Sequence, residues 1–269
     1  MKFDPQAVAG HIAEVAAQEI MPRFRTLSDS EVREKQSGEL VTIADVETEQ
    51  ALNDRLRGCL PGSSVVGEEA VAVKPDLLDH LETEGPIWIV DPVDGTSNFA
   101  AGKPVFAVMV ALIHGGETLA AWIHDPVAAR TLTAERGAGA WIGDRRVKVA
   151  EAESPSAMTG TLHASTYATP EIARKVQARR GRVDALKSLR CAGHEYLRLA
   201  EGRMHFSLFT RLMPWDHAPG SLINSKADGI AWTLDEAPYR ATSHRLPGLL
   251  LAPDETSWRA LRDTLLGPE

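Results

Sequence analysis

Hydrophobic residues recur at helical spacing in the first third of the chain. Residues 5–28 place their apolar side chains on one face, and residues 45–60 repeat the pattern until Pro61 and Gly62 end it. A shorter segment over residues 75–81 has the same character. We therefore predict two long amphipathic helices and one short helix in this part of the chain.

Short apolar runs separated by glycine turns follow, and they are typical of β-strands. The predicted strands are 64–67, 87–90, 105–113, 118–124, 130–134 and 147–149. Residues 151–157 lack periodicity and resemble a linker. After them strands and helices alternate: strands at 159–164, 185–189, 205–208, 230–233 and 248–252, and helices at 170–179, at 194–202, from about 216 and from about 255. This alternation predicts an α/β fold, with an N-terminal α+β domain at 1–150 and a C-terminal α/β domain at 151–269.

Length and charge narrow the class of protein. The 269 residues suffice for one large domain or two smaller ones, each with its own core. A net charge of -8 disfavours binding to nucleic acid or to an anionic membrane, and it means that an anionic substrate would need local compensation, for which bound cations are the obvious source. The longest apolar run, Val105–Ile113, is far shorter than the roughly 20 residues of a membrane span.

The N-terminus and the cysteines favour a cytoplasmic protein. The first residues, Met-Lys-Phe-Asp-Pro, lack the basic and then apolar pattern of a signal peptide, so we expect none. Cys59 and Cys191 are the only cysteines, which disfavours a disulfide-stapled fold. We expect both to be packing thiols.

The stretch from Ile87 to Phe99 is the most informative part of the sequence. An apolar strand ends in Asp91, and Asp94 follows three residues later, directly before Gly95 and Thr96. Two carboxylates so close together at the end of a buried strand need a counter-charge or a raised pKa. Carboxylate oxygens suit Mg²⁺, and glycine lets successive backbone N–H groups approach an anion. The stretch therefore predicts divalent cations beside a phosphate.

Three further acidic residues, Asp45, Glu68 and Asp216, each lie just past an apolar strand or at a helix start. Taken singly, Asp45 and Asp216 are consistent with helix N-caps. Glu68 is consistent with an exposed turn. From their positions alone, both structural and functional interpretations stay open.

Three segments together resemble the signatures of a known family. Gly67-Glu68-Glu69, Trp88–Phe99 and Trp215–Gly220 are similar to those of the inositol monophosphatase family, which are Mg²⁺-dependent, lithium-sensitive phosphomonoesterases of the sugar-phosphatase superfamily. Lys35 and Leu40–Asp45 resemble the family's N-terminal segment, with Glu39 in place of an aspartate. The resemblance implies a layered αβαβα fold, two or three Mg²⁺ ions in each active site and a homodimer.

The resemblance also implies a role for each matched residue. Glu68, Asp91 and the backbone carbonyl of Val93 would hold the first metal, and Asp91, Asp94 and Asp216 the second. Gly95 and Thr96 would bind phosphate through their backbone N–H groups. Thr96, with Glu68 or Asp45, would orient and deprotonate the attacking water.

The region that would contact the leaving group departs from the family pattern. The family has a Gly-[Ser/Thr]-Ala-Ala segment where this chain has Gly193-His194-Glu195-Tyr196, and it has an acidic residue before Trp-Asp where Phe206–Met213 has none. We therefore doubt that myo-inositol phosphate is the preferred substrate. His194 and Glu195 could contact a polyol or a cationic substrate, or could simply cap and solvate a helix start. Arg211 could contact a second phosphate or lie on the surface.

The sequence thus predicts a Mg²⁺-dependent phosphomonoesterase that hydrolyses a small phosphorylated metabolite by attack of a metal-activated water. Within the same class, the alternative is a phosphatase for histidinol phosphate or for a 3′,5′-bisphosphonucleotide. A non-catalytic regulatory member of the family is the alternative from another class, although a buried acidic set without a ligand would cost stability.

Overall fold

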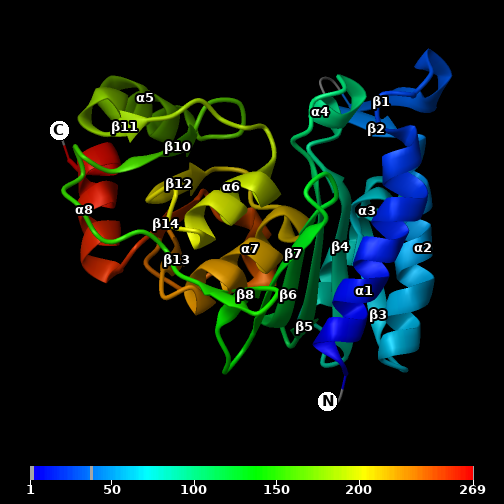
Figure 1. The fold of residues 1–269 in the computed structure, drawn as a ribbon. Coiled ribbons are helices and arrows are strands. Elements are labelled where there is room, and N and C mark those ends of the chain that lie inside the picture. Colours follow the sequence, from blue (N-terminus) through cyan, green and yellow to red (C-terminus); the bar gives the residue numbers. More distant parts are fainter. Residues whose placement is uncertain (1–2, 37–38, 269) are drawn as a thin grey trace.

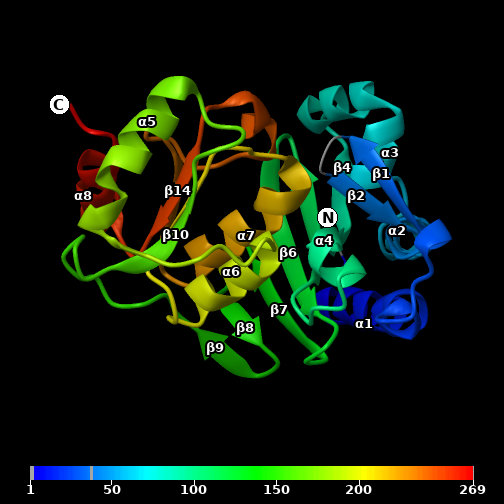
Figure 2. The ribbon, with the colours of Figure 1, turned by 90° about the horizontal axis from the view of Figure 1, so that it is seen from above.

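The computed structural model describes residues 3–36 and 39–268. The elements form five layers, a helical layer, a sheet, a helical layer, a second sheet and a last helical layer (Figure 1). The view from above shows the same order, with the two sheets on either side of the central helices (Figure 2). The predicted layered αβαβα fold is therefore confirmed.

The first layer consists of α1 (Pro5–Val15) and α2 (Ile43–Cys59). The prediction of one helix over 5–28 was too long, because the chain passes through a π-helical turn (Ala16–Ile20) into a 3-10 turn (Met21–Arg23). Pro22 has no N–H to continue an α-helix. The apolar faces of both helices pack on Trp88 and Trp122 of the sheet.

The first sheet has seven strands in the order β3-β4-β5-β6-β7-β8-β9. Their bounds are Ser64–Gly67, Pro86–Asp94, Ala107–His114, Glu117–Asp125, Arg130–Glu135, Ala140–Ile142 and Arg145–Val147. Only β3 and β4 pair in parallel, and the later strands form an antiparallel meander. Strand β4 is buried from Ile87 to Asp94. It carries two carboxylates into the interior of the molecule.

The central layer consists of α6 (Ala192–Ala200) and α7 (Pro214–Lys226). Both helices are buried because a sheet covers each side of this layer. Helix α7 contacts strands of both sheets. The N-terminal ends of the two helices therefore lie where the two sheets face each other.

The second sheet has the order β11-β10-β12-β14-β13. Its strands are Asp184–Ala185, Thr159–His163, Phe206–Phe209, Leu249–Ala252 and Ile230–Thr233, in that order. Helices α5 (Pro170–Arg179) and α8 (Glu255–Leu266) cover its outer face and contact each other. The strand predicted over 185–189 was too long, since only β11 forms.

Several short elements complete the fold. The hairpin of β1 (Val32–Gln36) and β2 (Glu39–Thr42), and helix α3 (Glu68–Val73), were not predicted. Helix α4 (Thr96–Ala100) follows β4, and 3-10 turns occupy Asp29–Glu31, Pro75–Glu82, Arg180–Arg182 and Ala241–Arg245. In the described part of the chain, none of the helices is long and apolar enough to cross a membrane.

Candidate active site

Three aspartates from distant parts of the chain meet between the two sheets. Asp91 and Asp94 end strand β4, and Asp216 lies in the first turn of α7. One carboxylate oxygen from each lies within 4.8 Å of the others. Burial, and then the neighbouring charges of Glu68, Asp94 and Asp216, raise the pKa of Asp91 well above its usual range. The buried carboxylates therefore disfavour one another's charge, and a bound cation would relieve that repulsion.

The donor set of this cluster fits a hard divalent cation. Asp91 is 1% exposed, and its Oδ1 has no hydrogen-bond partner among the described residues. A buried carboxylate oxygen without a donor is costly, and a cation would satisfy it. All three side chains offer oxygen, which is the ligand that Mg²⁺ and Ca²⁺ prefer.

Two residues at the start of α6 donate hydrogen bonds to the Asp94 carboxylate. Its Oδ2 accepts hydrogen bonds from the Gly193 N–H at 2.6 Å and from the Cys191 thiol at 3.0 Å. Cys191 is buried in the hydrophobic core, as expected of a packing thiol, and in addition it donates this hydrogen bond to Asp94. No spacing in the sequence connects residues 97 positions apart, so this contact could not be predicted.

Gly95 directs the chain sharply from β4 into α4. It has a φ of 90°, in the left-handed region that favours glycine. An added Cβ would lie 2.9 Å from the Val105 carbonyl oxygen and 3.2 Å from the Cβ of Cys191. Conformation and space both require glycine at this position.

Thr96 and Asp45 form a hydroxyl–carboxylate pair beside the cluster. The Thr96 hydroxyl lies 3.0 Å from Asp45 Oδ1 and 3.0 Å from the Val93 carbonyl oxygen. Asp45 Oδ2 accepts from the N–H and the hydroxyl of Thr42, which is the N-cap of α2. Burial raises the pKa of Asp45 to about 6. Asp45 thus takes part in the capping box and also faces the site, whereas Asp216 is not an N-cap, since Met213 occupies that position.

Glu68 begins α3 and is not part of the three-carboxylate cluster. Its carboxylate pairs with Lys35 at 3.1 Å, and Lys35 also pairs with Glu69. The segment is fixed by Glu49 on α2, which accepts from the N–H groups of Glu69 and Ala70. The role of Glu49 was not predicted, because nothing in the helical pattern separates a helix-capping glutamate from a solvated one.

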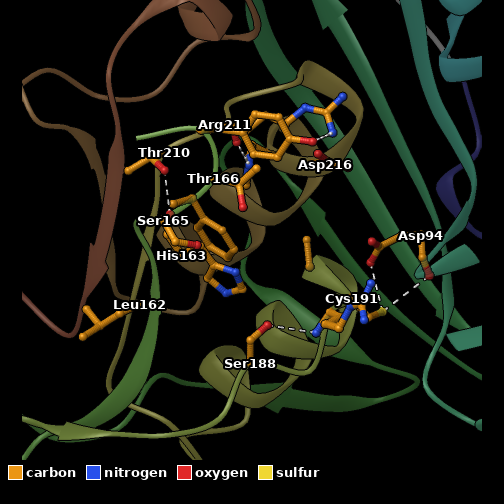
Figure 3. A pocket seen from close by; sticks show the side chains of 15 residues that line it. Asp94, Leu162, His163, Ser165, Thr166, Ser188, Cys191, Thr210, Arg211 and Asp216 are labelled. Carbon is orange, nitrogen blue, oxygen red and sulfur yellow. Dashed lines mark hydrogen bonds between the residues drawn. The ribbon is translucent and has the colours of Figure 1, made fainter. Parts of the chain in front are cut away.

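A cavity of about 610 Å³ opens beside the cluster. Asp94 and Cys191 lie on one side of it, and His163, Ser165 and Thr210 on the other, as Figure 3 shows. The described residues that line it also include Tyr167, Ser188, Arg190, Phe209, Arg211, Asp216 and His217. The cavity is large enough for a phosphorylated metabolite with a sizeable alcohol part.

Of the three residues predicted to select the substrate, Arg211 is among the described lining residues of the cavity, and His194 and Glu195 are not. Arg211 lines the cavity, where its guanidinium pairs with Glu39 at 2.5 Å and lies over the Tyr167 ring. His194 Nε2 lies 3.1 Å from the Phe106 carbonyl oxygen, outside the lining. Glu195 is fully buried behind the cavity wall. This geometry therefore argues against direct contact of His194 or Glu195 with a substrate.

His217 lines the cavity but is fully engaged by the protein. Its Nδ1 lies 2.9 Å from the Tyr196 hydroxyl, and its Nε2 lies 2.8 Å from the Arg211 carbonyl oxygen. Burial lowers the pKa of His217 to about 3, so the ring is neutral. Both nitrogens are occupied, and His217 is left with a structural role.

Comparisons with known proteins agree with this architecture. The model of the inositol monophosphatase family matches residues 5–259. Among curated relatives, fructose-1,6-bisphosphatase/inositol-1-monophosphatase from Thermotoga maritima is 31% identical over 73% of each chain. Inositol-1-monophosphatase from Rhizobium meliloti is 30% identical over 91% of this chain and 90% of its own.

Solved structures show the same fold at lower sequence identity. The extragenic suppressor protein from Bartonella henselae superposes with a TM-score of 0.79 at 23% identity, covering 98% of this chain and 97% of that one. The staphylococcal inositol monophosphatase-II superposes with a TM-score of 0.79 at 21% identity, covering 98% and 96%. The chain belongs to the inositol monophosphatase family and is a phosphoric monoester hydrolase.

Proposed function

We propose that the protein is a Mg²⁺-dependent phosphomonoesterase that hydrolyses a small phosphorylated metabolite. The observation that carries the proposal is the cluster of Asp91, Asp94 and Asp216, with its carboxylate oxygens within 4.8 Å of one another. In a phosphatase family, a buried acidic set beside a cavity suits cations that neutralise a phosphate and position it for attack.

The chain offers enough oxygen ligands for two ions. Asp91, Glu68 and the Val93 carbonyl would hold the first, and Asp91, Asp94 and Asp216 would hold the second. Bound Mg²⁺ would supply charge neutralisation and a water of lowered pKa. Lys35 holds Glu68 in the described structure, so Glu68 would exchange this ion pair for a metal contact. We propose two or three ions in each active site.

Thr96 and Asp45 would handle the attacking water. The Thr96 hydroxyl has one proton to donate, to Asp45 or to Val93, and a lone pair that can accept from water. Asp45, with its pKa raised to about 6, is ionised at neutral pH and can take up a proton. The N–H groups of Gly95 and Thr96 would bind the phosphate at the start of α4.

Phosphate release tests this function directly. The purified protein is assayed on sugar, inositol, histidinol and nucleotide phosphate esters, with Mg²⁺ and with EDTA. We expect Mg²⁺-dependent release from at least one ester and a loss of about 1,000-fold or more in Asp91→Asn, because Asp91 would contact both ions. Asp228→Asn is the matched control, since Asp228 lies on the surface and pairs with Lys148. No release above the Asp91→Asn level would overturn the proposal.

Thermal unfolding separates this enzyme from a non-catalytic relative that keeps the fold. A ligand that binds only the native state raises its stability. We expect Mg²⁺ with inorganic phosphate to raise the melting temperature of the native protein and not that of Asp91→Asn. The absence of any shift would favour the non-catalytic alternative.

Further properties follow from family membership and belong to the same proposal. We propose inhibition by lithium, a homodimer and a cytoplasmic location. Inhibition of phosphate release by LiCl but not by KCl, and the mass measured by light scattering, test the first two. Localisation of the tagged protein tests the third.

A further inference from the structure

The cavity beside the cluster has an uneven distribution of charge. Among the described lining residues, the only carboxylates are Asp94 and Asp216, at the end where the cations would bind. Besides His217, whose two ring nitrogens are already occupied, the remaining lining carries three basic side chains, His163, Arg190 and Arg211. Bound cations would neutralise the acidic end, and the rest of the cavity would then favour an anion.

His163 is the most firmly positioned of the three. It ends strand β10, two residues after Thr161, so the two side chains share one face of the sheet. Its neighbour across the parallel pair is Phe209, and the two rings stack with centroids 4.6 Å apart. The His163 carbonyl accepts a hydrogen bond from Thr210 at 2.6 Å. Ring and backbone are thus both held in place.

Glu195 lies directly behind His163. Its carboxylate is fully buried and accepts hydrogen bonds from Thr161 at 2.6 Å, from Ser207 at 3.2 Å and from the Leu189 N–H at 3.0 Å. The Ser188 hydroxyl donates to the same carboxylate at 3.3 Å, and the His163 Nε2 lies 2.6 Å from it. Because an ionised carboxylate only accepts, Nε2 carries a proton. A buried carboxylate also needs a positive partner, and His163 is the ion-pair partner that the structure provides.

This arrangement leaves one nitrogen of His163 for a ligand. Glu195 occupies Nε2, and Nδ1 has no partner among the described residues, while the side chain is 27% exposed in the cavity lining. Nδ1 is thus the ring nitrogen of His163 that is open to a ligand.

Arg190 is the second free donor. It has a φ of 55°, a conformation that costs energy for a side chain other than glycine. Its N–H donates to the Ser188 hydroxyl and its carbonyl accepts from Asn98, so the backbone is tied down on both sides. Its guanidinium has no ion pair or hydrogen bond with the described residues, whereas that of Arg211 is paired with Glu39.

We propose that His163 and Arg190 select a substrate whose alcohol part carries a second acidic group, a carboxylate or a phosphate, and that Glu195 is the positioning residue that holds His163. The proposal rests on the proposed phosphatase function and specifies its substrate class. The second group would accept from the free Nδ1 of His163 and from the Arg190 guanidinium.

Matched substrates test the proposal on the native enzyme. The pairs are 2-phosphoglycerate and glycerol 2-phosphate, 6-phosphogluconate and glucose 6-phosphate, and fructose 1,6-bisphosphate and fructose 6-phosphate. In at least one pair, we expect the more acidic member to have a kcat/KM higher by about tenfold or more, mainly through a lower KM. If esters are hydrolysed but no pair differs, this inference is overturned and the phosphatase function stands. If no ester is hydrolysed, the proposed function itself fails.

Variants then assign the selectivity to the two residues. His163→Gln and Arg190→Gln should each lower kcat/KM for the acidic member by about tenfold, with little change for its neutral partner. Glu195→Gln should act in the same direction, through KM. Ser207→Ala is the matched control, because it removes a hydrogen bond to the same carboxylate without touching His163. Equal losses on both members of a pair in His163→Gln would contradict the assignment.

Discussion

The Thr96 hydroxyl and the Asp45 carboxylate, 51 residues apart in the chain, lie 3.0 Å from each other beside the acidic cluster. If this pair orients the attacking water, Thr96→Val should lower kcat by about 100-fold with little change in KM. Thr96→Ser keeps the hydroxyl and should retain most of the activity. Steady-state phosphate release on any accepted ester measures both variants, and a loss of equal size in Thr96→Ser would point to packing instead.

The pH dependence of stability should report the environment of Asp45. Burial raises its pKa from an ordinary 3.8 to about 6, so the folded protein binds this proton more tightly than the unfolded chain does. In EDTA, this residue therefore makes the free energy of unfolding fall as the pH rises from about 4 to about 6, by about 3 kcal/mol. In Asp45→Asn that part of the fall should disappear. Urea unfolding at several pH values measures it, and identical slopes in the two proteins would contradict the account.

Much of this fold could be predicted from the sequence because its elements have strong periodicity. Helix α5 begins and ends at the predicted residues, and strand β13 does so as well. The hairpin of β1 and β2 was missed, since its charged residues do not alternate clearly with apolar ones. The apolar spacing also did not reveal the change from α-helix to a π-helical turn after Val15, or the 3-10 turn that holds Pro22.

The candidate site also has parts that the sequence predicts and parts that it does not. Asp91 and Asp94 share one strand, so the sequence alone placed them together, while the approach of Asp216 was anticipated only through the family resemblance. The contacts of Cys191 with Asp94 and of His163 with Glu195 join residues with no shared motif. Such contacts depend on the packing of the two sheets on the central helices, which local sequence does not encode.

Gly95 offers a test of backbone shape. Gly95→Ala should destabilise the protein by about 2 kcal/mol or more, because an added methyl group meets the Val105 carbonyl in a conformation that alanine already disfavours. It should also abolish activity by displacing Thr96. Gly62→Ala is a matched control, since Gly62 has a φ of 87° but open space around it. Denaturant unfolding and phosphate release compare the two, and similar costs in both would show that the close contact is unimportant.

Cys191 should contribute to activity through its hydrogen bond to Asp94. Cys191→Ala removes the donor and should weaken Mg²⁺ activation by about three- to tenfold. Cys191→Ser restores a hydroxyl donor and should recover most of that loss. The Mg²⁺ concentration for half-maximal phosphate release is the measurement, with Cys59→Ala as the control at a distance. An unchanged value in Cys191→Ala would return the thiol to a packing role.

The central claim is that the Asp91, Asp94 and Asp216 cluster binds the cations that hydrolysis requires. The test is a calorimetric titration, in which Mg²⁺ is added to the metal-free protein in the presence of inorganic phosphate. We expect saturable Mg²⁺ binding to the native protein and to Asp228→Asn, and a loss of at least about tenfold in Mg²⁺ affinity in Asp91→Asn. Equal Mg²⁺ affinity in the native protein and in Asp91→Asn would contradict it.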